Sequence, residues 1–311
     1  MNKHGLYSDF LQHHQLPAAY LVQAEQWFAP LISDVLSQII ATPKTQTSKA
    51  LVIGINGCQG SGKSTLADYL RTTLVLMHNI ETVSVSLDDF YLTKAERQAL
   101  AESEHPLLSP RGVPGTHDAA LAIELICKLA RQKEGSIALP TFDKSRDDRD
   151  EDQPHIINLP VKVIILEGWC LGAEPQTHEQ LATPLNDLET EQDQNGQWRA
   201  AVNQALASDY AALFGLVDCW LMLKAPAFNC VYQWRLEQEQ KMAAKLGVDI
   251  LNKHQSEHSD IMDAEEIQHF ISHYQRITEH GLKTLPNKMH HLYELDQHRN
   301  IVRHSQPVAM P

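Results

Sequence analysis

The sequence predicts an α/β fold in which a mostly parallel sheet is flanked by helices, and three observations support this prediction. Short apolar runs rich in Val, Ile and Leu recur along the chain, as is typical of strands buried on both faces. Segments with helical periodicity separate these runs. A glycine-rich stretch lies between the first run and the helix that follows it. Strands that alternate with helices indicate βαβ units and therefore a parallel sheet.

The expected elements follow in a regular order. Apolar side chains recur at helical spacing from residue 16 to residue 40, which predicts a first helix with an apolar stripe of Tyr20, Trp27, Leu31, Val35 and Ile39. Further helices are expected from Thr65 onward and at 119–131, 228–246 and 263–282. Strands are expected at 51–56, 82–87, 161–166, 216–223 and 291–295, the last of which should end the sheet.

Polar segments suggest how the chain is divided. Residues 41–48 are polar and contain Pro43, so we expect a helical N-terminal extension at 1–48 and a main catalytic domain at 49–311. Residues 172–197 are polar and irregular, with an acidic run at Glu189, Glu191 and Asp193. We interpret this segment as a surface insertion.

Composition limits the partners and the compartment. The 311 residues carry a formal net charge of −13, and so acidic a surface repels nucleic acid and anionic membranes. Five cysteines without a C-x-x-C pair indicate reduced thiols. The N-terminus has no signal-peptide pattern, and no apolar run approaches the length of a membrane span. We therefore expect a cytoplasmic protein that brings its own basic residues to any anionic small-molecule substrate.

The glycine-rich stretch fits the phosphate-binding pattern G-x-x-x-x-G-K-[ST]. Glycines let the loop curl so that its N–H groups point at phosphate oxygens, and the next helix adds its N-terminal donors. Lys63 should reach the β- and γ-phosphates, and Ser64 should ligate Mg²⁺. The pattern predicts a P-loop NTPase fold that binds ATP and Mg²⁺. The residues expected to bind the nucleotide are Gly57, Cys58, Gln59, Gly60, Ser61, Gly62, Lys63, Ser64 and Thr65. Backbone donors around Cys58 favour a thiolate, the alternative being an inert small side chain.

Carboxylates stand at the ends of two predicted strands. Ligands bind beyond the carboxyl ends of strands in such sheets, so these side chains and the P-loop should share one site. Glu167 closes the strand at 161–166 and is expected to serve Mg²⁺, directly or through water. At the end of the strand at 82–87, Asp88 is the expected base that takes a proton from a hydroxyl acceptor. Asp89 fits a helix cap better.

Basic residues between 111 and 149 offer ligands for an anionic acceptor, because Arg can bind a carboxylate through two parallel hydrogen bonds. The region offers Arg111, Lys144, Arg146 and Arg149, and we expect Arg111, His117, Lys144 and Arg149 to orient the acceptor. A plain turn leading into a helix cap would also explain residues 111–118, and a solvated loop of salt bridges would also explain residues 142–149.

Two other features have competing interpretations. Arg235 lies on a predicted helix and is either a mobile charge that closes on the transferring phosphoryl group or a helix-face partner of Glu239. Histidine pairs at helical spacing occur at 254/258 and 269/273. No further ligands converge on either pair, so we expect solvated helix faces instead of metal sites.

The segment Ser-Leu-Asp-Asp-Phe-Tyr at 86–91 resembles the strand-end motif of P-loop kinases such as uridine kinase, pantothenate kinase and phosphoribulokinase, whose first acid is the proposed base. The closer resemblance is to D-glycerate 3-kinase and its fungal and bacterial relatives. It spans roughly residues 50–300 and is carried by residues 57–65, 88–92, 111–118, 142–145, 167–172, 184–189, 198–203 and 234–235. It implies ATP-dependent phosphorylation of D-glycerate to 3-phosphoglycerate, with a lid around Arg235. Residues 146–152 are shorter and more acidic than the matching stretch of plant members, so the Arg that contacts the acceptor stays open.

Two rival functions remain. One is a kinase of the same fold that acts on another small alcohol, such as a nucleoside, pantothenate or a sugar phosphate. The other is a nucleotide-dependent switch that hydrolyses ATP slowly. Asp88 argues against the switch, because a switch positions a water molecule and needs no base for a hydroxyl acceptor.

Overall fold

The computed structural model describes residues 3–41, 49–246, 262 and 264–310. Its main sheet runs in the order β10-β9-β8-β1-β7-β2, which comprises β1 (Leu51–Gly57), β2 (Thr82–Ser86), β7 (Val163–Gly168), β8 (Cys219–Lys224), β9 (His291–Leu295) and β10 (Ile301–Ser305). β1 pairs in parallel with β7 and β8, and β2 and β9 continue the parallel arrangement at either side. The prediction of a mostly parallel sheet is therefore confirmed.

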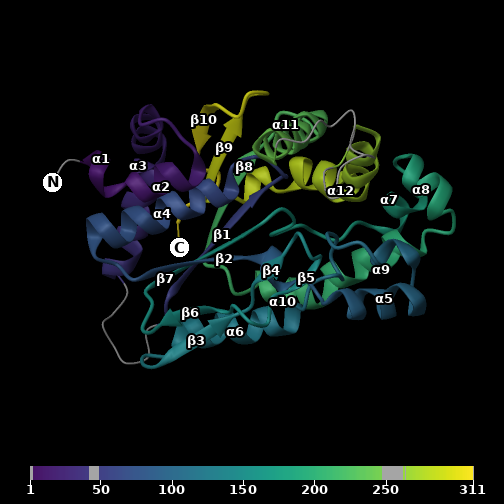
Figure 1. Cartoon of the computed structure of the whole chain (residues 1–311), viewed down its shortest axis with the longest axis horizontal. Helices are drawn as coiled ribbons and strands as arrows, with labels where there is room; N and C mark the ends of the chain where they lie inside the picture. Colours follow the sequence, from purple (N-terminus) through teal and green to yellow (C-terminus); the bar gives the residue numbers. More distant parts are fainter. Residues whose placement is uncertain (1–2, 42–48, 247–261, 263, 311) are drawn as a thin grey trace.

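Helices cover both faces of this sheet (Figure 1). On one face, Ile53 and Ile55 of β1 share a buried cluster with Leu66 of α4 (Lys63–His78). On the other face, Val52 shares a cluster with Ile126 of α6 (Ala119–Arg131). Successive side chains of a strand point to opposite faces, so β1 supplies both cores. Each such fully buried aliphatic side chain stabilises the fold by about 1.5–3 kcal/mol.

The remaining helices cluster around the two ends of the sheet. Those after β2 are η1 (Leu87–Phe90), α5 (Lys94–Ser103) and η2 (Pro106–Leu108), and those after β7 are α7 (His178–Ala182), α8 (Asp187–Gln192), α9 (Gln197–Ala205), η3 (Leu206–Tyr210) and α10 (Ala211–Phe214). After β8 come α11 (Asn229–Leu246), α12 (Ala264–Thr284) and η5 (Pro286–Lys288). The helices predicted at 119–131, 228–246 and 263–282 are confirmed. Among the described residues, no helix is long and apolar enough to cross a membrane.

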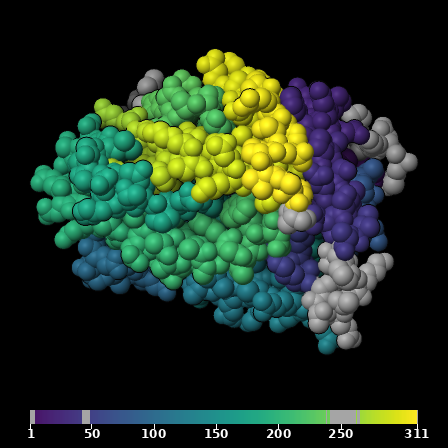
Figure 2. Space-filling model, turned by 180° about the vertical axis from the view of Figure 1, so that it is seen from behind, coloured from purple at the N-terminus to yellow at the C-terminus, as the bar shows by residue number. Residues whose placement is uncertain are grey.

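The N-terminal segment packs onto the helix that follows the P-loop. α3 (Ala19–Ala41) confirms the predicted first helix, and α1 (Lys3–Leu6) and α2 (Ser8–His14) precede it. The Tyr7 hydroxyl lies 2.9 Å from Thr73 Oγ1 of α4, and the rings of Phe10 and Phe28 contact Tyr69. Figure 2 shows this segment in purple beside the yellow C-terminal strands. The contacts join it to the body of the molecule.

Several strands escaped sequence prediction. The strand at 291–295 does not end the sheet, because β10 adds an antiparallel strand at its edge. Two small antiparallel pairs lie between α6 and β7, namely β3 (Ser136–Leu139) with β6 (His155–Asn158) and β4 (Phe142–Asp143) with β5 (Asp148–Arg149). These strands have only two to four residues each, so they are too short to show the longer apolar run that marks a buried strand.

The prediction of an acidic surface run at 189–193 was wrong at two positions. Glu189 is fully buried and accepts hydrogen bonds from Arg276 of α12, at 2.7 Å to Nε and 2.5 Å to an amino group. Asp193 is also buried and accepts from the backbone N–H of Trp198 at 2.8 Å. Buried charges are tolerated when they are paired and hydrogen-bonded, which a composition argument cannot detect. The segment 172–197 therefore holds α12 in place.

Of the two histidine pairs, His254 and His258 lie outside the described residues. His269 and His273 lie on α12, where the His273 ring contacts the His269 carbonyl at 3.1 Å. His269 is exposed as expected, but His273 is buried, so the prediction of a solvated face was wrong at this residue. Among the described residues, no group of three or more His, Cys, Asp or Glu side chains could hold a metal ion.

Candidate active site

The P-loop connects β1 to α4 with the backbone geometry that phosphate binding requires. Gly60 and Gly62 have φ angles of +76° and +94°, a region that side chains disfavour. A Cβ atom on Gly60 would lie 2.8 Å from Cβ of Trp234 in α11, so glycine also permits close contact between loop and helix. α4 begins at Lys63. The unpaired N–H groups of the first turn of this helix therefore point into the loop.

Polar groups of the loop are left for a ligand. Ser61 Oγ is buried and has no hydrogen-bond partner among the described residues. The Lys63 ammonium rests on the Cys58 carbonyl at 3.2 Å. A lysine that donates only to a backbone carbonyl retains donors for phosphate oxygens. The loop therefore fits the phosphates of a nucleotide.

The hypothesis of a thiolate at Cys58 was wrong. The side chain is 5% exposed, and burial raises the pKa of its thiol to about 12, against the opposing charge of Lys63. Desolvation of the charged form outweighs the nearby donors. Cys58 is therefore a protonated, buried side chain within the loop.

Oxygen ligands for a divalent cation meet beside the P-loop. Glu167 at the end of β7 accepts hydrogen bonds from Ser64 Oγ at 2.9 Å and from Ser86 Oγ of β2 at 3.0 Å. A carboxylate and hydroxyls are the donor set that Mg²⁺ prefers. The residues expected to hold the metal are thus together, and Ser86 is a third group that the sequence did not single out.

Asp88 lies at the start of η1 with a cation on its carboxylate. Lys144 Nζ is 2.6 Å from one carboxylate oxygen, and the Tyr91 hydroxyl donates to the other at 3.2 Å. Burial acts to raise the pKa of Asp88, but Lys144 outweighs it and lowers the pKa to about 2. Asp88 is therefore ionised, and its proton affinity is controlled by one mobile side chain, since Lys144 is 61% exposed.

The interpretation of Asp89 as a helix cap was wrong. α5 is capped by Thr93, in a capping box with Glu96. The Asp89 carboxylate instead accepts from the backbone N–H of Phe142 at 3.3 Å, which ties η1 to β4. Burial raises its pKa to about 6, and the neighbouring charge of Asp88 adds to this shift.

Arg111 is held by residues that the sequence analysis missed. Its guanidinium pairs with Asp147 and donates to the Lys144 carbonyl at 3.3 Å. Arg97 of α5 is 1% exposed and donates to the Asp147 carbonyl at 2.7 Å. A buried arginine with several backbone acceptors fixes the loops that it joins. Arg97 therefore organises the segment that carries Arg111 and Lys144.

The loop at 111–118 is held from two sides. The Trp169 indole donates to the Gly112 carbonyl at 3.0 Å, and the Tyr274 hydroxyl of α12 donates to the Arg111 carbonyl at 3.3 Å. Gly112 has a φ of +147°, and a Cβ atom there would lie 2.2 Å from the Tyr274 hydroxyl. The loop also ends in a helix cap, because Asp118 accepts from Leu121 N at the start of α6. It is thus more than the plain turn considered above.

The Arg149 side chain binds other parts of the protein, whereas a residue that binds the acceptor is expected to keep donors for it. Its guanidinium donates to the Tyr91 carbonyl at 2.8 Å and to Asp118 at 3.3 Å. Both contacts fasten β5 to the loops around Asp88. In this structure Arg149, like Arg111, is therefore engaged by a carboxylate and by backbone carbonyl groups.

His117 lies beside Asp88 but is shielded from solvent. Its ring stacks on Tyr91 with a centroid distance of 4.2 Å, and its Nδ1 is 2.5 Å from the Tyr210 hydroxyl. Burial lowers the pKa of His117 to about 4, although the charge of Asp88 opposes this shift. The imidazole is therefore neutral at neutral pH.

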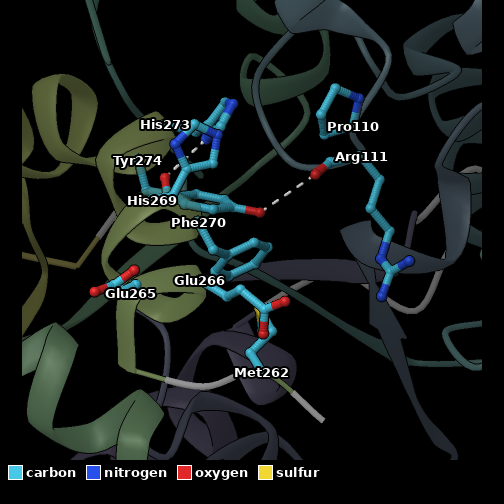
Figure 3. Close-up of a pocket in the computed structure, with 9 residues that line it drawn as sticks. All are labelled: Pro110, Arg111, Met262, Glu265, Glu266, His269, Phe270, His273 and Tyr274. Carbon is cyan, nitrogen blue, oxygen red and sulfur yellow. Dashed lines mark hydrogen bonds between the residues drawn. The ribbon is translucent and has the colours of Figure 1, made fainter. Parts of the chain in front are cut away.

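A cavity of about 510 Å³ opens between the Arg111 loop and α12. Figure 3 shows Phe270 and Tyr274 of α12 facing Pro110 and Arg111 across it. In this structure Arg235 takes the helix-face arrangement, paired with Glu239 and lying 5.2 Å from the Phe270 ring centroid. Burial raises the pKa of Tyr274, and the charges of Asp88, Arg111 and Arg235 all act on it. Of these charged groups, Arg111 lines the cavity, as does Tyr274 itself.

No protein-family model matches the chain. Among curated proteins, it is 34% identical over 269 residues to the uncharacterized kinase mug58 of Schizosaccharomyces pombe, a match that covers 84% of this chain and 91% of that protein. It is 33% identical over 237 residues to the chloroplastic D-glycerate 3-kinase of Arabidopsis thaliana, covering 72% of this chain and 46% of that protein.

A solved structure gives the same result. D-glycerate 3-kinase from Cryptococcus neoformans matches with a TM-score of 0.69 and 26% identity, over 89% of this chain and 98% of that one. The similarity of sequence and of structure extends across both the P-loop and the loops around Asp88. The chain therefore belongs to the D-glycerate 3-kinase family of P-loop kinases and is a phosphotransferase with an alcohol group as acceptor.

Proposed function

We propose that this kinase transfers the γ-phosphoryl group of Mg·ATP to the primary hydroxyl of D-glycerate and forms 3-phosphoglycerate. The observation that carries the proposal is the contact between Asp88 and Lys144, at 2.6 Å. It joins a base suited to a hydroxyl with a cation suited to a carboxylate, and glycerate carries both groups. The names of the relatives from Arabidopsis and Cryptococcus support the same acceptor.

The nucleotide end of the site binds ATP through the P-loop. Backbone N–H groups and Lys63 hold the phosphates, while Ser64 and Glu167 would hold Mg²⁺. The metal, when bound, offsets negative charge on the β- and γ-phosphate oxygens. Trp234 packs on Gly60 and keeps α11, the helix that carries Arg235, against the loop. After the Arg235 guanidinium leaves Glu239, it stabilises the negative charge on the phosphoryl group that is being transferred.

The acceptor end couples binding to activation of the base. With a pKa near 2, Asp88 is too weak a base while Lys144 lies on it. The carboxylate of the acceptor draws Lys144 toward itself, with Arg111 and His117 as further contacts, and this raises the proton affinity of Asp88. The proton of the acceptor hydroxyl then passes to Asp88 while the hydroxyl oxygen bonds to the γ-phosphorus. The bond between the γ-phosphorus and the oxygen that bridges it to the β-phosphate breaks, which releases ADP.

One observation favours a larger acceptor as a second candidate. The cavity beside the Arg111 loop has the rings of Phe270 and Tyr274 in its wall, and such rings would suit the base of a nucleoside. Release of ADP from Mg·ATP, measured with D-glycerate, L-glycerate, uridine and pantothenate in parallel, separates the candidates. Stimulation by D-glycerate alone is the expected result. Stimulation by uridine or pantothenate would retain the mechanism and replace the substrate, and ATP hydrolysis unaffected by any acceptor would favour a switch.

A further inference from the structure

Tyr210 forms a buried hydrogen-bonded pair with His117, although 93 residues separate them in the chain. Tyr210 is 1% exposed and closes η3, a π-helical turn between α9 and α10. Such turns are rare and are found frequently at functional sites. The Tyr210 hydroxyl lies 2.5 Å from His117 Nδ1 and also accepts the backbone N–H of Gly115 at 3.2 Å.

These contacts determine where the proton of the imidazole resides. Burial raises the pKa of Tyr210 well above its ordinary value, so the hydroxyl keeps its proton at neutral pH. The Gly115 N–H already occupies one lone pair of the hydroxyl oxygen. The hydroxyl proton is therefore donated to His117 Nδ1, because no other acceptor for it is found among the described residues. A neutral imidazole that accepts at Nδ1 carries its own proton at Nε2.

The Nε2–H group is buried and has no partner among the described residues. Buried donors without a partner are costly and uncommon in proteins, so this group is expected to pair with a ligand. Its location indicates which ligand. The His117 ring stacks on Tyr91, and the Tyr91 hydroxyl donates to Asp88 at 3.2 Å. The imidazole is thus part of the same space as the base.

We propose that Tyr210 is a positioning residue that fixes the Nδ1-accepting tautomer of His117, so that Nε2–H donates to an anionic oxygen of the acceptor, such as a carboxylate. The ligand class rests on the proposed function, whereas the tautomer does not. A neutral donor binds the carboxylate without changing its own charge. Its contribution to acceptor affinity is accordingly constant above about pH 5, the region in which a histidine with a low pKa stays neutral.

The tautomer can be read directly in the ligand-free protein. In protein labelled with ¹⁵N-histidine, long-range ¹H–¹⁵N correlations distinguish a protonated nitrogen from an unprotonated one, and His117→Gln assigns the signal. The wild type is expected to show Nε2 protonated and Nδ1 bare. Tyr210→Phe is expected to move His117 toward a mixture of tautomers. A wild-type spectrum with Nδ1 protonated would overturn the proposal, and this result would not depend on which acceptor the enzyme uses.

Kinetics test the role of the tautomer with whichever acceptor stimulates ADP release. Tyr210→Phe is expected to raise the acceptor KM about tenfold, as for the loss of one hydrogen bond to a charged group, and to leave the ATP KM unchanged. Tyr293→Phe is the matched control, because Tyr293 is equally buried, has a hydroxyl without a partner among the described residues, and lies in the other core. An equal rise of both KM values in Tyr210→Phe, or no rise at all, would contradict a positioning role.

A double-mutant cycle separates positioning from packing. The side-chain amide of glutamine in His117→Gln places a donor near the position of Nε2 and needs no tautomer to be fixed. In that background, Tyr210→Phe is expected to have little further effect on the acceptor KM. Additive effects of the two substitutions would mean that Tyr210 acts independently of His117.

Discussion

The two halves of the active site are built in different ways. Most of the proposed nucleotide half comes from one segment, residues 57–65, which contains the loop, the lysine and Ser64, while Glu167 is added from β7. The acceptor half is assembled from distant segments: Asp88 and Lys144 are 56 residues apart, and His117 and Tyr210 are 93 residues apart. A contiguous motif carries its geometry in its own backbone, whereas the acceptor half exists only after the chain has folded. The two halves should therefore respond differently to substitution.

The largest effect is expected in the acceptor half, from Asp88→Asn. The amide cannot accept the hydroxyl proton, so turnover should fall by roughly 10²–10⁴ while the Kd for ATP stays within about threefold. Single-turnover kinetics together with ATP titration measure the two quantities. Asp89→Asn is the control and should keep most of its turnover, because the amide oxygen can still accept the backbone N–H of Phe142. Near-normal turnover in Asp88→Asn would remove the assignment of the base.

Lys63→Ala should break the nucleotide half instead. Loss of a charge-assisted hydrogen bond costs about 1.5–3 kcal/mol, so the Kd for ATP should rise roughly 10- to 100-fold, and turnover should fall with it. Fluorescence titration with a nucleotide analogue checks the binding. If Lys63→Ala bound ATP normally, the P-loop would not hold the phosphates as described.

Lys144→Gln tests the coupling, within the acceptor half, between acceptor binding and the proton affinity of Asp88. Without the ammonium, the pKa of Asp88 rises, so the acidic limb of the pH profile of kcat/KM should move to higher pH. The acceptor KM should also rise, by about tenfold, because a charged partner of the carboxylate is gone. Arg146→Gln, which removes an exposed cation of the same hairpin, should leave both quantities unchanged. An unshifted acidic limb in Lys144→Gln would show that Lys144 does not control the base.

The smallest effect is expected on stability, from Asp89→Asn. Burial raises the pKa of Asp89 from 3.8 to about 6 in the folded protein, so its carboxylate destabilises the fold as pH rises through this interval. Removing the charge should stabilise the protein by about 1–2 kcal/mol at pH 7.5, allowing for partial exposure, and by almost nothing at pH 4. Urea unfolding at both pH values measures this difference.

Asp143 provides a control of opposite sign. Hydrogen bonds from Ser145 lower its pKa, so this carboxylate stabilises the fold above its unfolded pKa and loses that contribution as pH falls. Asp143→Asn should therefore reduce stability at neutral pH. Equal gains for Asp89→Asn at pH 4 and pH 7.5 would contradict the role given to burial.

The same contrast explains what could be predicted from the sequence. The parallel sheet, the P-loop and the placement of Glu167 follow from apolar runs and from a motif with fixed local geometry. The rule that ligands bind beyond the carboxyl ends of parallel strands also predicted that Asp88 lies near the P-loop helix and Glu167. Within the P-loop, the sequence left two states open for Cys58, and burial decides in favour of the inert thiol because it raises the pKa.

What the sequence could not supply is tertiary pairing. Arg97 and Tyr210 have the pattern of ordinary helix residues, yet the first joins the loops around Arg111 and the second forms a hydrogen bond with His117. Glu189 reads as a surface acid because its partner, Arg276, is 87 residues away. Arg149 has the charge of an acceptor ligand, but backbone carbonyls that only the folded loop presents take up its donors. In each case the residue type was visible, and the partner that gives it a role was not.

The most direct measurement is the identity of the phosphorylated product. The enzyme is incubated with Mg·ATP and D-glycerate, and the products are resolved by ³¹P NMR against 2- and 3-phosphoglycerate standards. If Asp88 takes the proton of the primary hydroxyl while Lys144 holds the carboxylate, 3-phosphoglycerate should be the only new phosphate ester and should form in equal amount to ADP. Inorganic phosphate alone, or the 2-phosphate isomer, would contradict this arrangement of the acceptor.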